Sequence, residues 1–222
     1  MIELHHCDSA RSFRPLWMLE ELGLPYTLKM WPFPPRVHTR EFLALNPLGT
    51  VPLFIDGDVR MTESAATCQY LAALSRPTPL DVDADDPAFA AYLNALHFGE
   101  ATLTFPQTLV LRYRRLEPAE RRLPQVAEDY ERWFLSRLRK GVGTLEGGFY
   151  AAGRFTAADV SIGYALLLAA KLGLDAQFTP EVAAYWARLS ARPGYRRAQE
   201  AQRAALAAQN VQPTDFRGQA SS

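Results

Sequence analysis

Cysteine is scarce in this chain. Cys7 and Cys68 are the two cysteines among 222 residues, too few for the disulfide framework of a small secreted domain. The sequence also lacks an N-terminal charged-then-apolar leader and any apolar run of membrane-spanning length. We therefore expect a protein of a reducing compartment, the cytoplasm, with no membrane partner.

An excess of one charge sign is also missing. Lysine plus arginine and aspartate plus glutamate number 24 each, so no global field attracts nucleic acid, and we expect no such partner. His5 and His6 resemble a metal pair only superficially, because adjacent strand residues point to opposite faces. We expect no metal site. The 48% hydrophobic content suffices for a buried core in one large or two small domains.

The most informative stretch is Asn46–Leu74. Two short strands, 51–55 and 59–61, flank a glycine-centred turn, and a helix follows from 65 to 74. The start of a helix carries unpaired N–H groups and partial positive charge, so it can hold a carboxylate or phosphate. The same pattern also fits an ordinary hairpin followed by a capped helix that binds no ligand.

The head of the first of these strands is a second candidate contact. Pro52 withholds one backbone donor there, and an extended ligand could pair with the backbone of Val51. The sequence thus offers a backbone slot for a peptide and, one strand later, an anion-binding helix start.

The remaining segments predict two domains. Strand 1–6, helix 12–22 and strand 26–31 precede the hairpin, an order typical of a thioredoxin-like α/β domain over 1–76. A Pro- and Asp-rich linker follows at 77–86, and an all-α domain at 87–222. Its predicted helices are 88–115, kinked by Pro106; 119–145, interrupted near Pro124; 156–172, opened by a Thr156–Asp159 capping box; 180–190; and 194–208. The tail after Asn210 is expected to be mobile at its end.

Two segments resemble a known family. NPLGTVPLFIDGDVRMTESAATCQYL and GRFTAADVSIGYALL are similar to segments of the cytosolic glutathione S-transferases, as found in bacteria. The resemblance extends over nearly the whole chain and implies the glutathione transferase fold. It implies that Pro52 is a cis-proline and that Val51 pairs with the cysteinyl part of glutathione. It also implies that Glu63 and Ser64 hold the γ-glutamyl end, and it places His38 near the glycyl carboxylate.

The resemblance further implies a hydroxyl or thiol after the first strand that holds the glutathione sulfur as a thiolate. Aligned with the zeta-like pattern of the family, the chain has this group at Ser9, our predicted catalytic residue. The theta-like register puts it on Ala10, which cannot donate, and leaves Ser12 in reserve. Cys7 lies too early for the beta-type cysteine and is expected to be buried. Arg14 could raise the local positive potential or simply be solvated.

The expected function is glutathione transfer, with glutathione as co-substrate, to a small hydrophobic electrophile. His97, Ala101 and Phe105 share one face of a predicted helix and are the candidate co-substrate pocket, although core packing explains them equally well. A homodimer is implied by the resemblance. Alternatives are a glutathione-dependent isomerase, dehalogenase or disulfide reductase on the same fold. The alternative from a different class is a non-catalytic glutathione-binding or assembly module.

Overall fold

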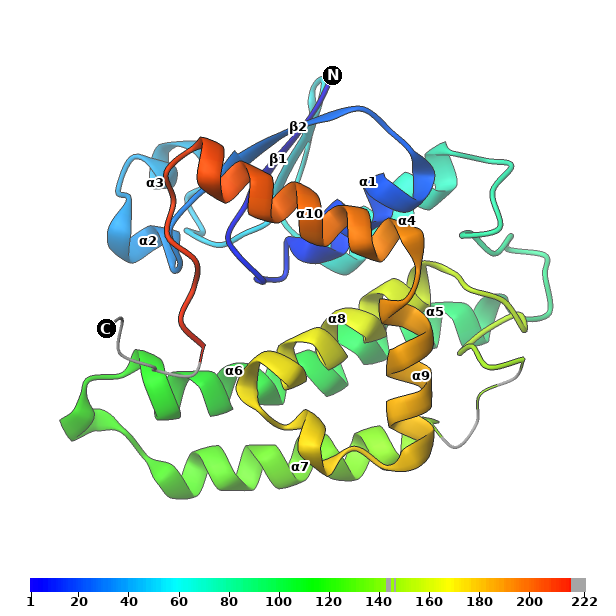
Figure 1. Ribbon diagram of the computed structural model, residues 1–222. Coiled ribbons are helices and arrows are strands. Elements are labelled where there is room, and N and C mark those ends of the chain that lie inside the picture. The colour runs from blue at the N-terminus through cyan, green and yellow to red at the C-terminus, as the bar shows by residue number, and fades with distance from the viewer. Residues whose placement is uncertain (143–144, 146, 217–222) are drawn as a thin grey trace. The chain divides into compact units, whose positions relative to one another are not determined.

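The computed structural model describes residues 1–142, 145 and 147–216 (Figure 1). The chain forms two compact units. The first contains Met1–Asp81 and Ser190–Thr214, and the second contains the described residues of Val82–Leu189 together with Asp215 and Phe216. No helix in the described part of the chain is long and apolar enough to cross a membrane.

The first unit is built on a four-stranded sheet of order β2-β1-β3-β4. Its strands are β1 (Ile2–His6), β2 (Tyr26–Met30), β3 (Leu53–Asp56) and β4 (Val59–Met61). β1 pairs with β2 in parallel, and the other two pairings are antiparallel. All four strands were predicted, so the hydrophobic pattern and the Gly57 turn are sufficient to indicate the sheet.

Helices pack against this sheet. They are α1 (Phe13–Leu22), the short α2 (Pro35–His38) and α3 (Phe42–Leu45), α4 (Ser64–Leu74) and α10 (Pro193–Ala208). α1 ends at Gly23, whose φ of 65° is the left-handed conformation that glycine adopts at low cost. α1 contacts both α4 and α10.

α10 is the element whose place differs most from expectation. The sequence put it within 87–222, whereas its contacts assign it to the first unit (Figure 1). The Arg192 guanidinium donates two hydrogen bonds to the Glu21 carboxylate, at 2.8 and 2.9 Å. The Tyr195 ring packs edge-on against Trp17, with ring centroids 5.0 Å apart. Both contacts join α10 to α1, so the helix completes the first unit's core.

The second unit is helical. Its elements are α5 (Phe89–His97), the π-helical η1 (Phe98–Thr104), α6 (Phe105–Leu111), the π-helical η2 (Arg112–Leu116), the 3₁₀ turn η3 (Ala119–Arg121), α7 (Pro124–Val142), α8 (Ala157–Leu172), the 3₁₀ turn η4 (Asp175–Gln177) and α9 (Pro180–Ser190). The predicted helix 88–115 is thus interrupted by π-helical turns. Pro106 lies in the first turn of α6, where a proline is tolerated.

α8 is the centre of this unit, since every residue from Ala157 to Ala169 is buried. Its predicted capping box is confirmed: the Thr156 N–H donates to Asp159 Oδ2 at 2.9 Å. Asp159 Oδ1 accepts the Tyr185 hydroxyl at 2.7 Å and the Tyr150 N–H at 3.1 Å. Burial raises the pKa of this carboxyl, and the hydrogen bonds oppose that shift. The box therefore also ties the segment around Tyr150 to α8.

Candidate active site

The start of α4 has the features of an anion-binding site. Ser64, the first residue of the helix, is 3% exposed, and its Oγ accepts a hydrogen bond of 3.0 Å from Arg14 Nη1. The Arg14 side chain, from α1, is fully buried. A buried guanidinium adds its charge to the partial positive charge of the helix N-terminus. Because Ser64 accepts from Arg14, its own O–H can donate to a carboxylate.

The hairpin that leads to α4 begins just after Val51 and Pro52. The Val51–Pro52 peptide bond is cis, as the resemblance implied. Phe54 pairs with Met61, so Pro52 and Val51 lie just before the last pair of the hairpin in one strand and the residues that follow Met61 lie just after it in the other. Those residues include Glu63, which is exposed, and Ser64.

The loop after β1 carries Ser9 in a strained conformation. Ser9 is fully buried with a φ of 52°, in the left-handed region that costs a non-glycine residue about 1–2 kcal/mol. Its Oγ donates to Asp8 Oδ1 at 2.9 Å, and its backbone N–H donates to Gln202 Oε1 at 2.8 Å. The second oxygen of Asp8 accepts the Thr214 N–H at 2.9 Å. The loop is thus held by residues from the far end of the chain.

Ser12 is engaged inside the protein as well. Its Oγ lies 2.6 Å from His6 Nδ1, and His6 Nε2 lies 2.8 Å from Gln202 Oε1. Burial lowers the pKa of His6 to about 4, although the bond to Gln202 opposes this shift, so the ring is neutral at pH 7. Since the amide oxygen of Gln202 requires a donor, Nε2 carries the proton and Nδ1 accepts from the Ser12 hydroxyl.

The sequence model of the family described as "Glutathione S-transferase, N-terminal domain" matches residues 8–74, which include Ser9, Arg14, Val51 and Ser64. Residues 8–74 are a glutathione S-transferase N-terminal domain.

Relatives extend the similarity beyond this domain. Glutathione S-transferase 3 of Schizosaccharomyces pombe is 38% identical over 106 residues, covering 46% of this chain and 43% of that protein. The chain therefore matches less than half of that relative's length. A glutathione transferase from Methylococcus capsulatus strain Bath has a TM-score of 0.80 at 23% identity, over 92% of this chain and 100% of that one. A glutathione transferase homologue from Sulfitobacter, solved with bound glutathione, has a TM-score of 0.78 at 20% identity, over 90% and 98%.

These structures share the fold. Its parts are a thioredoxin-like sheet-and-helix domain at the N-terminus and a helical region that follows, as the sequence predicted.

In this glutathione S-transferase domain, Cys7 is buried as expected and packs with Ala10 and Val51. Burial raises the pKa of its thiol, and the neighbouring Asp8 raises it further, so Cys7 stays protonated at neutral pH. Burial also raises the pKa of Cys68, to about 12, although the charge of Arg14 opposes this shift.

His38 lies at the end of α2 and is exposed. In the second unit His97 and Ala101 are exposed, and Phe105 is 52% exposed. The π-helical turn η1 separates His97 from Phe105, so the α-helical spacing behind their predicted common face does not hold along the whole segment.

The adjacent histidines have separate neighbours. His5 Nδ1 accepts from Trp31 Nε1 at 2.9 Å, and His5 Nε2 lies 2.8 Å from Glu3 Oε1, whereas His6 contacts Ser12 and Gln202. No group of three or more His, Cys, Asp or Glu side chains in the described ranges is arranged to hold a metal ion.

The sequence did not indicate two residues that hold the loop after β1, Gln202 and Thr214. Gln202 lies in an Ala- and Gln-rich helix with no motif, 193 residues from Ser9. Thr214 lies in the weakly patterned tail. No local signal distinguishes either residue, because each contact is made between distant parts of the chain.

Proposed function

We propose that this protein binds glutathione in its first unit and transfers it to a small hydrophobic electrophile. The single observation that carries glutathione binding is the buried Arg14–Ser64 pair at the start of α4. In this proposal Ser64 and the helix N-terminus hold the γ-glutamyl carboxylate, and Glu63 receives the amino group. The backbone of Val51, next to Pro52, pairs with the cysteinyl part. The bound glutathione of the Sulfitobacter homologue supports the same ligand here.

His38 is proposed to contact the glycyl carboxylate, since it is exposed in α2, close in sequence to the hairpin. The electrophile is proposed to lie against the exposed His97, Ala101 and Phe105. A homodimer and a cytoplasmic location belong to the same proposal. The two cysteines are free and buried, as suits a reducing compartment.

Ser9 is the proposed thiolate donor. A hydrogen bond to the glutathione sulfur favours the thiolate, which then attacks the electrophilic carbon. For this step the Ser9 hydroxyl must turn from Asp8, its acceptor at 2.9 Å, to the sulfur.

That requirement favours a second candidate function, a non-catalytic glutathione-binding module. The Ser9 hydroxyl donates to Asp8 and the Ser12 hydroxyl to His6, so both protons are already used inside the protein. A disulfide reductase acting through Cys7 is disfavoured, because its burial opposes the thiolate. Isomerase and dehalogenase activities need the same activated thiolate as the transferase.

The experiment is the ultraviolet thiolate absorbance of glutathione bound to the full chain, measured across pH. A bound-thiol pKa well below that of free glutathione supports transfer. An unshifted pKa with tight binding supports the binding module.

Ser64→Ala tests the pocket itself. It should weaken glutathione binding by about 1–3 kcal/mol, the cost of losing a hydrogen bond to a charged group. Ser75→Ala, at the other end of α4, is the matched control. Equal affinities in the Ser64 variant and the parent contradict the proposed site.

A further inference from the structure

The segment that follows α10 is attached to the rest of the first unit at both of its ends. At one end, the Gln209 side chain accepts the Met30 N–H at 2.8 Å and donates to the Leu28 carbonyl at 2.9 Å, both in β2. At the other end, Thr214 contacts Asp8 twice: its N–H donates to Oδ2 at 2.9 Å and its hydroxyl donates to the backbone carbonyl at 3.2 Å. We call residues 209–214 the strap (red in Figure 1).

The middle of the strap has little to hold it in place. Residues 210–213 form no helix or strand, and Asn210, Gln212 and Pro213 are exposed. A segment with few buried contacts opens locally at a small cost in free energy, while the elements around it stay folded. Thr214 can therefore leave Asp8 without the unfolding of α10.

Asp8 passes the contact with the strap on to Ser9. It is 5% exposed, and the oxygen that does not bind Thr214 accepts the Ser9 hydroxyl at 2.9 Å. Because a buried carboxylate needs hydrogen-bond donors, Thr214 stabilises the arrangement in which Asp8 takes the Ser9 proton. The charge of Asp8 also adds to burial in raising the pKa of the Cys7 thiol. A carboxylate in this place therefore disfavours a thiolate beside the loop.

We propose that the strap is an autoinhibitory element of the glutathione site. With Thr214 on Asp8, Ser9 is fully buried and donates to the carboxylate, so the protein binds glutathione without activating its thiol. When Thr214 leaves, water replaces its bonds to Asp8, the carboxylate turns outward, and the Ser9 hydroxyl can donate to the sulfur. This inference rests on the proposed function, whose two candidates, the binding module and the transferase, become two states of one protein.

The first test is Thr214→Glu in the full chain. The Thr214 hydroxyl faces Asp8, so a carboxylate in its place repels Asp8 and favours release of the strap. The bound-thiol pKa, from the ultraviolet absorbance titration, should fall by about one unit, which is about a tenfold gain in thiolate at neutral pH. Thr214→Gln has the same shape without the charge, and Gln212→Glu adds the charge at an exposed position of the strap. Both controls should keep the parent's value.

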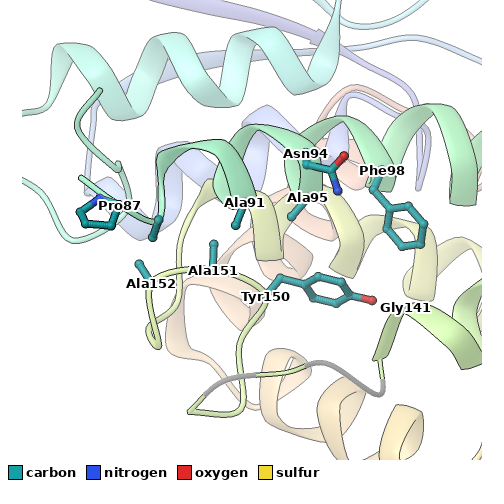
Figure 2. Close-up of a pocket in the computed structure, with 10 residues that line it drawn as sticks. Pro87, Ala91, Asn94, Ala95, Phe98, Gly141, Tyr150, Ala151 and Ala152 are labelled. Atoms are coloured by element: carbon teal, nitrogen blue, oxygen red, sulfur yellow. The ribbon is translucent and has the colours of Figure 1, made fainter. Parts of the chain in front are cut away.

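A second readout needs no glutathione. Ser9→Cys is introduced into the parent and into Thr214→Glu, and iodoacetamide labelling of position 9 is followed by tandem mass spectrometry. Release of the strap should accelerate this labelling about tenfold or more. Asn94→Cys is the control position, because Asn94 is exposed on α5 in the wall of a pocket of about 600 Å³ in the second unit (Figure 2). Its labelling rate should be equal in the two backgrounds.

Three results overturn the proposal: Thr214→Glu binds glutathione with the parent's thiol pKa, labelling of position 9 does not accelerate, or a control variant lowers the thiol pKa as much as Thr214→Glu does. If neither the parent nor any variant binds glutathione, the proposed function is wrong instead. The labelling rates then still decide whether the strap controls access to Ser9.

Discussion

Gln202 makes the most consequential contact between distant parts of the first unit. Its Oε1 accepts the Ser9 N–H and the His6 Nε2–H, each at 2.8 Å, and the three residues are at most 2% exposed. Gln202→Leu keeps a similar volume and removes the acceptor. Two buried donors then lack partners, and each costs about 1–3 kcal/mol. We expect the free energy of unfolding to fall by roughly 2–6 kcal/mol, the sum of these two costs.

Gln209→Leu is the matched control. Gln209 is the C-cap residue directly after α10; it accepts the Met30 N–H at 2.8 Å and donates to the Leu28 carbonyl at 2.9 Å. Its side chain is exposed, so water replaces the lost partners and the expected cost is below about 1 kcal/mol. The contrast between the two variants tests burial, since the residue type and the number of hydrogen bonds are the same.

The assay combines urea unfolding with hydrogen exchange. Exchange of the Ser9 amide should accelerate in Gln202→Leu, because the strained φ of 52° loses the acceptor that holds it. Equal losses of stability in the two variants, or an unchanged Ser9 exchange rate, would refute the reasoning.

Three further predictions follow from other buried groups. The pKa of His6 is lowered from 6.5 to about 4, so its contribution to the free energy of unfolding is complete above pH 6.5 and falls by about 3 kcal/mol as the pH drops towards 4. The free energy of unfolding of His6→Gln, measured across pH, should lack this loss. A curve for His6→Gln that runs parallel to that of the parent contradicts the prediction. Ser9→Ala should lower turnover more than glutathione affinity and raise the bound-thiol pKa; an unchanged pKa in the absorbance titration assigns the thiolate to another donor. Gly99→Ala should destabilise the second unit by about 1–3 kcal/mol or more, because its β-carbon would lie 2.6 Å from the Ser161 backbone carbon in α8. If thermal unfolding shows that the variant is as stable as the parent, η1 can move away from α8 and the prediction is wrong.

The sheet and the start of α4 could be predicted because their signals are local. The turn at Gly57, the proline at position 52 and the serine that opens α4 lie within 13 residues of one another, and a hairpin that turns at Gly57 leads the chain from the proline to the start of α4. The Thr156–Asp159 capping box is also local, within one helical turn. In each case the residues that make the contact specify it by their spacing in the sequence.

The loop after β1 shows where that reasoning stops. A serine at position 9 or 12 can be identified as a candidate donor from spacing, but the acceptor of its proton cannot. That acceptor depends on His6 being neutral, which in turn depends on burial beneath α10 and on Gln202 accepting from its Nε2. α10 itself has no pattern that distinguishes packing on α1 from packing within the helical unit. The sequence can therefore indicate that a serine hydroxyl lies after β1, but not whether that hydroxyl is free to donate to the glutathione sulfur. Contacts with residues about 190 positions away determine whether it is free.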